Sequence, residues 1–225
     1  MSQSYCLAWE CVGRSGSVCA LATDGSTLYS DDLAGVAAAS HLVPSIDRCL
    51  RQCGRPESIA VAIGPGSFTG LRISTVAART LAWCDGLPVI PVPSLAALAC
   101  AQGAGNWYTL LPLKKDVTFH AAYHVDGDGS WQELMPVQAL ADDAPLPSLS
   151  SLPEQITLVG PALSAKPDLL ARLPHSLPRG QDEAPQAHGV ALAARSCQAL
   201  ADLDQLLPAY HRQSAPELQR QGQRG

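Results

Sequence analysis

One segment constrains the fold of this chain more than any other, because a strand signal, a glycine-rich turn and a helix signal follow one another in it. Ser58–Ile63 is a continuous apolar run, which is typical of a strand buried on both faces of a sheet. The run stops at Gly64-Pro65-Gly66, and beyond it apolar residues recur at steps of three and four as far as Cys84. This strand, turn and helix order predicts an α/β layer with parallel strand pairing.

Further strand and helix signals lie on both sides of this segment. Before it, we expect strands over residues 5–9, 18–23 and 27–30 and a helix that carries the stripe Val36, Ala39, Val43, Ile46, Leu50 and Cys53. After it, we expect a strand over residues 87–92 and a helix over 95–101 that is capped by Ser94. Beyond these come strands over 107–111, 117–125, 130–134 and 156–159 and a final helix over 189–207.

The pattern of strand and helix signals changes near residue 105, which predicts two lobes. We assign residues 1–104 to a first lobe and residues 105–186 to a second, smaller one. A C-terminal helix within 187–212 is expected to pack back on the first lobe, and residues 213–225 are expected to form a frayed polar tail.

Two helix faces are candidate interaction surfaces. The stripe on the first helix suits either ordinary core packing or a contact with a helix of a partner subunit. The second helix carries small residues on one side, which would let another helix approach closely. The predicted partner interface therefore consists of Val36, Ala39, Val43, Ile46, Leu50, Ser74, Thr75 and Ala78.

The turn between strand and helix is a candidate anion or nucleotide loop, formed by Gly64, Gly66, Ser67, Thr69 and Gly70. Its spacing is G-x-G-x-x-x-G, so it matches neither the dinucleotide-binding pattern nor the phosphate-binding loop, which requires Gly-Lys-Ser/Thr. A purely structural turn and an anion site both remain open for this loop.

No other motif predicts metal or catalytic chemistry. His120 and His124 have the spacing of a helical metal pair, but their segment alternates with strand period, so the two imidazoles would lie about 13 Å apart. No nucleophile elbow is present. Glu10, at the end of the first expected strand, is either a solvated carboxylate or a remnant of a metal or nucleophile position.

Composition excludes several classes of protein. The net charge is −5 and aromatic residues make up 5% of the chain, which argues against direct binding of nucleic acid. No apolar run reaches the ~18 residues that span a bilayer. The eight cysteines include no C-x-x-C pair, so we interpret them as buried, reduced thiols of a cytoplasmic protein.

The run from Val61 to Ile73, which reads VAIGPGSFTGLRI, resembles the signature of the TsaB (YeaZ) family. The similarity continues through Leu87-Pro88-Val89 and Pro93–Leu98, with weaker matches at His41–Asp47 and Pro208–Arg212. The chain departs from the family at Glu10-Cys11-Val12, where Asp-Thr-Ser is common, and at residues 112–117, where an acidic, arginine-containing segment is common.

The resemblance implies a two-lobed α/β fold of the actin, Hsp70, sugar-kinase and ribonuclease H type. It also implies a non-catalytic subunit that supports threonylcarbamoylation of adenosine in tRNA by pairing with a TsaD-like transferase, with a TsaE-like ATPase as a further partner. By the same resemblance, the chain alone binds no cofactor or metal, and ATP binds only at an interface with a partner. The resemblance also implies that the chain reaches tRNA only through the complex, with a homodimer as an alternative pairing.

Two other classes of function compete with this scaffold role. The first is an enzyme of the same fold, either an ATP-dependent transferase or a peptidase. A catalytic relative needs two helical histidines, and the first helix offers only His41, because Ser45 stands four residues further on. The second is a small-ligand binding module that uses the glycine-rich loop.

Overall fold

The computed structural model describes residues 3–13, 15–33, 38–114, 117–141, 143–144, 148–174 and 176–210. Side chains are not described at positions 38, 39, 113 and 114.

The first sheet has five strands in the order β3-β2-β1-β4-β5. β1 (Tyr5–Glu10), β2 (Gly16–Ala22) and β3 (Thr27–Leu33) pair antiparallel, whereas β1, β4 (Ser58–Gly64) and β5 (Val89–Pro93) pair parallel. The parallel pairing follows from the helical crossovers, since a parallel strand needs a long connection across a face of the sheet. The strands predicted in this part of the sequence are confirmed.

The second sheet has the order β8-β7-β6-β9. It contains β6 (Gly105–Lys114), β7 (Val117–Val125), β8 (Trp131–Ala141) and β9 (Thr157–Val159). A strand was predicted over residues 130–134, and β8 is considerably longer. It pairs with β7 through two register shifts as far as Ala141.

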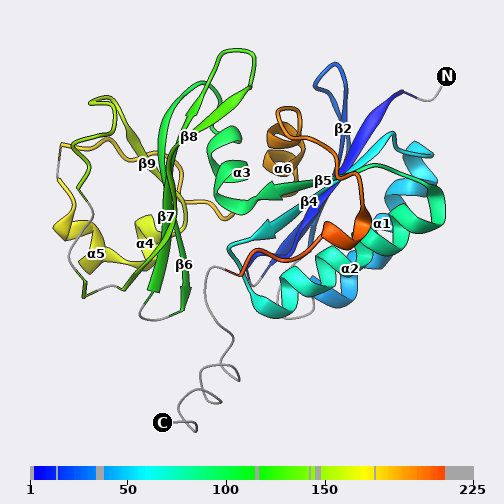
Figure 1. Cartoon of the computed structure of the whole chain (residues 1–225), viewed down its shortest axis with the longest axis horizontal. Coiled ribbons are helices and arrows are strands. Elements are labelled where there is room, and N and C mark those ends of the chain that lie inside the picture. Colours follow the sequence, from blue (N-terminus) through cyan, green and yellow to red (C-terminus); the bar gives the residue numbers. More distant parts are fainter. Residues whose placement is uncertain are drawn as a thin grey trace, which may run out of the picture.

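Helices separate and cover the two sheets, as Figure 1 shows. α1 (Ala38–Cys53) and α2 (Phe68–Asp85) cover the outer face of the first sheet. α3 (Ser94–Cys100) and α6 (Ala187–Ala194) lie between the sheets, and α4 (Ala162–Ala165) and α5 (Pro167–Arg172) lie beyond the second sheet. One apolar cluster contains side chains from both sheets and from α3 and α6, so the two lobes share a core.

Two helix predictions are wrong in detail. The final helix was expected over residues 189–207 but ends at Ala194; after it, the described chain contains only the short 3-10 helix η1 (Leu203–Gln205). Ser94 was expected to cap α3, but it is the first residue of the helix, and its hydroxyl is buried without a hydrogen-bond partner. The cap position is held by Pro93, whose ring fixes a backbone angle that suits a helix start.

Candidate functional site

The glycine-rich turn leads directly into α2, and local chemistry defines both ends of this helix. The Ser67 hydroxyl accepts a hydrogen bond from the backbone N–H of Gly70 at 3.4 Å, which satisfies one of the free donors of the first turn. At the other end, Gly86 adopts a left-handed conformation with φ of 62° and donates its N–H to Ala82. The orientation of α2 on the sheet is therefore set by the turn that precedes it.

The small-residue side of α2 faces the sheet, which corrects the predicted interface. Ser74, Thr75 and Ala78 are at most 3% exposed. The Trp9 indole of β1 donates a hydrogen bond to the Ser74 carbonyl oxygen at 3.1 Å. Small side chains were expected to admit a partner helix, but they instead let α2 approach its own sheet. These three residues therefore belong to the core of the first lobe.

The opposite side of α2 forms an exposed apolar groove with α1. The groove has a volume of about 520 Å³. Val43 of α1 and Val76 of α2 are each 61% exposed, and Trp83 at the end of α2 is 79% exposed. The groove is lined by Val43, Ile46, Arg72, Ile73, Val76, Ala77, Thr80, Leu81 and Cys84. An apolar surface of this kind usually marks a binding site, so we call it the α1/α2 groove and take it as the candidate functional site.

The stripe predicted on the first helix divides between this groove and the core. Val43 and Ile46 line the groove, although Ile46 is largely buried, and Leu50 is half-buried against the core cluster beneath α1. Val36 and the side chain of Ala39 lie outside the described residues. Cys84 is exposed in the groove, which corrects the expectation that the cysteines are buried.

A C-terminal segment, residues 200–210, runs along α2 (Figure 1). Leu206 is buried in the core beneath the helices, and Arg79 of α2 forms an ion pair with Asp204 at 2.5 Å. Tyr210 stacks on Phe68 with ring centroids 4.9 Å apart, and its hydroxyl accepts a hydrogen bond from Arg72. Arg72 also lines the groove, so this segment helps to shape the candidate site.

The glycine-rich loop is packed tightly against the turn after β1. Backbone bonds join Ser67 N–H to the Val12 oxygen at 2.8 Å and Ala209 N–H to the Ile63 oxygen at 2.7 Å. A Cβ atom added at Gly66 would lie 3.0 Å from the Val12 side chain. The backbone N–H groups of Ser67 and Gly70 are therefore already used within the protein, which favours the structural turn. Anion binding at Gly64, Gly66, Ser67, Thr69 and Gly70 remains a prediction.

Glu10 is buried, so the expectation of a solvated carboxylate is wrong. Its side chain accepts hydrogen bonds from the Val12 N–H at 2.7 Å and from the Ser17 hydroxyl at 2.8 Å. Ser17 in turn accepts a bond from the N–H of Ala187, the first residue of α6, at 2.8 Å. Burial raises the pKa of Glu10 to about 7, and the two hydrogen bonds only partly oppose this rise. Glu10 therefore connects β1, β2 and α6.

This environment gives a pH dependence that a Glu10→Gln variant should remove. The pKa of Glu10 is raised from 4.5 to about 7 by folding, so its contribution to the free energy of unfolding is fully present below pH 4.5 and is lost as the pH rises through 7. The loss is roughly 3 kcal/mol, at about 1.4 kcal/mol per pKa unit. Urea unfolding of both proteins between pH 4.5 and 8 should show this difference. If the two proteins differed in free energy of unfolding by the same amount at every pH, the raised pKa of Glu10 would be contradicted.

His120 and His124 lie on β7, which confirms the strand prediction, and they have different partners. The His120 ring is buried and hydrogen-bonded to the Tyr108 hydroxyl at 2.9 Å, and burial lowers its pKa to about 4. His124 contacts Asn106 and Asp126. In the described part of the chain, no group of three His, Cys, Asp or Glu residues could hold a metal ion. Among the described helices, none has the length and apolar character needed to cross a bilayer.

Comparisons with known proteins give concordant results. A family profile described as "TsaD: tRNA N6-adenosine threonylcarbamoyltransferase" matches residues 32–112. The chain is 36% identical over 86 residues to the tRNA threonylcarbamoyladenosine biosynthesis protein TsaB of Haemophilus influenzae, a match that covers 36% of each chain. It is 41% identical over 61 residues to the protein of the same name from Bacillus subtilis, covering 25% of this chain and 27% of that relative.

A crystal structure from Pseudomonas aeruginosa, described as an uncharacterized protein with similarity to peptidase YeaZ, superposes with a TM-score of 0.77. The sequences are 24% identical, and the match covers 93% of this chain and 100% of the other. The likeness in structure therefore extends over nearly the whole chain, whereas the sequence matches span about a third of the length of the curated relatives. Together with the strand order of the first sheet, this likeness confirms the predicted α/β fold.

Proposed function

Because these matches assign the chain to the TsaB (YeaZ) family, we propose that it serves the biosynthesis of threonylcarbamoyladenosine in tRNA as a non-catalytic subunit that docks a TsaD-like transferase. The observation that carries this proposal is the α1/α2 groove. An apolar surface exposed between two helices lowers the solubility of the free chain. A partner that covers the groove removes this surface from water.

The chemistry of the groove favours a helical, apolar partner surface. Apart from Arg72, its lining side chains carry no charge, and the Arg72 guanidinium is already held over the Phe68 ring at 4.1 Å and bonded to Tyr210. Such a groove between two helices accepts the apolar face of a partner helix. A second copy of the chain could use the same surface, so a homodimer is the competing pairing.

The remaining parts of the proposal follow from the family. We place any ATP at the interface with a partner, since the chain offers no phosphate-loop lysine. A TsaE-like ATPase is proposed as a further partner, tRNA is reached through the assembled complex, and the site of action is the cytoplasm. The competing enzyme hypothesis rests on Glu10, whose two carboxylate oxygens are already engaged by Val12 and Ser17, so this residue is poorly placed to act on a substrate.

Co-purification tests the docking surface. We expect the chain to co-elute with the TsaD-like protein of the same cell, and Val43→Asp to weaken the complex at least about 100-fold, because the new carboxylate is desolvated in the interface without a partner. Val43 is exposed in the free chain, so the variant should remain folded by circular dichroism.

Gln138→Glu is the matched control. Gln138 is exposed on β8 in the second lobe, so the variant also adds one negative charge, but away from the groove, and it should bind normally. Wild-type affinity of folded Val43→Asp would exclude the groove as the docking surface.

A further inference from the structure

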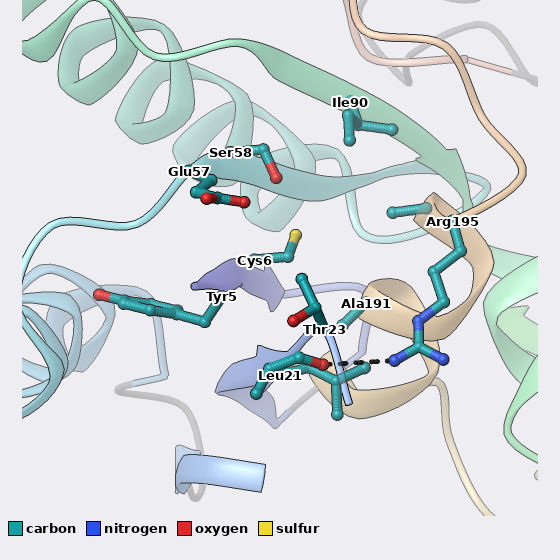
Figure 2. Close-up of a pocket in the computed structure, with 11 residues that line it drawn as sticks. Tyr5, Cys6, Leu21, Thr23, Glu57, Ser58, Ile90, Ala191 and Arg195 are labelled. Atoms are coloured by element: carbon teal, nitrogen blue, oxygen red, sulfur yellow. Dashed lines mark hydrogen bonds between the residues drawn. The ribbon is translucent and has the colours of Figure 1, made fainter. Parts of the chain in front are cut away.

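A second concavity lies where the amino ends of β1 and β4 meet the carboxyl end of α6 (Figure 2). Its volume is about 150 Å³, and it shares no lining residue with the α1/α2 groove. Leu21, Ile90 and Ala191 give it apolar walls, while the Cys6 thiol and the Ser58 hydroxyl lie near its centre. This pocket plays no part in the function proposed above.

One wall of the pocket carries a guanidinium with spare hydrogen-bonding capacity. Arg195 directly follows α6, and its Nη2 donates to the Ala22 carbonyl oxygen at 3.3 Å. Among the described residues, no carboxylate lies within ion-pair distance of this guanidinium. Burial and then the charge of Arg195 lower the pKa of His188, in the first turn of α6. The Arg195 guanidinium therefore has donors left with which it could bind an anion.

The opposite wall limits the charge that such an anion can carry. Glu57 lies across the pocket from Arg195 in Figure 2, and its carboxylate accepts a hydrogen bond from the Ser4 hydroxyl at 2.5 Å. The carboxyl end of α6 also contributes partial negative charge. Both groups repel an anion, and they repel a doubly charged one such as phosphate more strongly, so the electrostatics favour a single negative charge.

The size of the pocket limits the ligand further. A volume of 150 Å³ corresponds to about five water molecules at roughly 30 Å³ each. A short alkyl chain would fill the space between Leu21, Ile90 and Ala191 while its head group meets Arg195. We propose that this pocket binds a small aliphatic monocarboxylate, with the carboxylate on Arg195 and the alkyl chain against the apolar wall.

Titration calorimetry of the isolated chain with butyrate tests the proposal. We expect saturable binding with a Kd on the order of 1 mM, as the small number of ligand atoms permits. Arg195→Gln should weaken binding at least about tenfold, because it removes a charge-assisted hydrogen bond. Succinate and inorganic phosphate should bind more weakly than butyrate.

Arg55→Gln provides the matched control, since Arg55 is also exposed and also donates to a backbone oxygen, that of Asp85. It should leave butyrate binding unchanged. The proposal is overturned if butyrate shows no saturable binding, if binding survives in Arg195→Gln, or if phosphate binds more tightly than butyrate. Because the partner protein is absent from this experiment, its outcome is independent of the docking function.

Discussion

Ala78→Glu is expected to unfold the protein and not merely to disturb an interface. Ala78 is fully buried on the side of α2 that faces the sheet. A glutamate there would place an unpaired carboxylate in the core and would also overfill it. The combined cost should be on the order of 5 kcal/mol or more, which is comparable with the whole stability of a typical domain. Loss of the cooperative transition in thermal or urea unfolding would show it.

Val76→Glu is the matched control, because it introduces the same side chain on the same helix. Val76 is 61% exposed in the groove, so the new carboxylate stays in water and the free energy of unfolding should change by less than about 1 kcal/mol. If Ala78→Glu instead folded normally and lost only its partner, the small-residue side of α2 would be the docking surface after all.

The contrast between these positions shows what helix periodicity can predict. The steps of three and four located α1 and α2 and separated the two sides of α2 correctly. They could not decide which side meets the sheet, because Ile73, Val76 and Leu81 are as apolar as a core requires. Close packing decided it: Ser74 and Ala78 allow α2 to lie against β1 and β4, where bulkier side chains would hold it away.

Features that depend on distant contacts were not predictable from local patterns. Glu10 ends β1, where a carboxylate is commonly solvated, and only the fold brings Ser17 and α6 around it. Arg195 has no motif, and its pocket forms from five separate parts of the chain. The family match at Pro208–Arg212 was visible in the sequence, but the contact of Tyr210 with Phe68 and Arg72 appears only when residues more than 130 positions apart meet.

Gly70→Ala should destabilise the protein strongly, although the same change usually stabilises a helix. Gly70 lies in the first turn of α2, where alanine has the higher helix propensity by about 1 kcal/mol. A Cβ atom at this position, however, would lie 1.9 Å from the Cys11 carbonyl oxygen and 3.0 Å from its carbon. Both are backbone atoms, so no side-chain rotation relieves the overlap. The helix start or the turn after β1 must move, and we expect a net loss of about 4 kcal/mol.

Gly13→Ala separates this steric effect from the general effect of replacing glycine. Gly13 lies in the same turn after β1, its φ is not positive, and a Cβ atom there would meet nothing within 4 Å. Alanine should therefore be neutral or stabilising by up to about 1 kcal/mol, since it restricts the unfolded chain. Relative to the unmodified protein, urea unfolding should show a lower free energy of unfolding for Gly70→Ala and an unchanged or higher one for Gly13→Ala. Equal stabilities would mean that α2 does not approach Cys11 as closely as described, and the groove that α2 forms with α1 would then need a different shape.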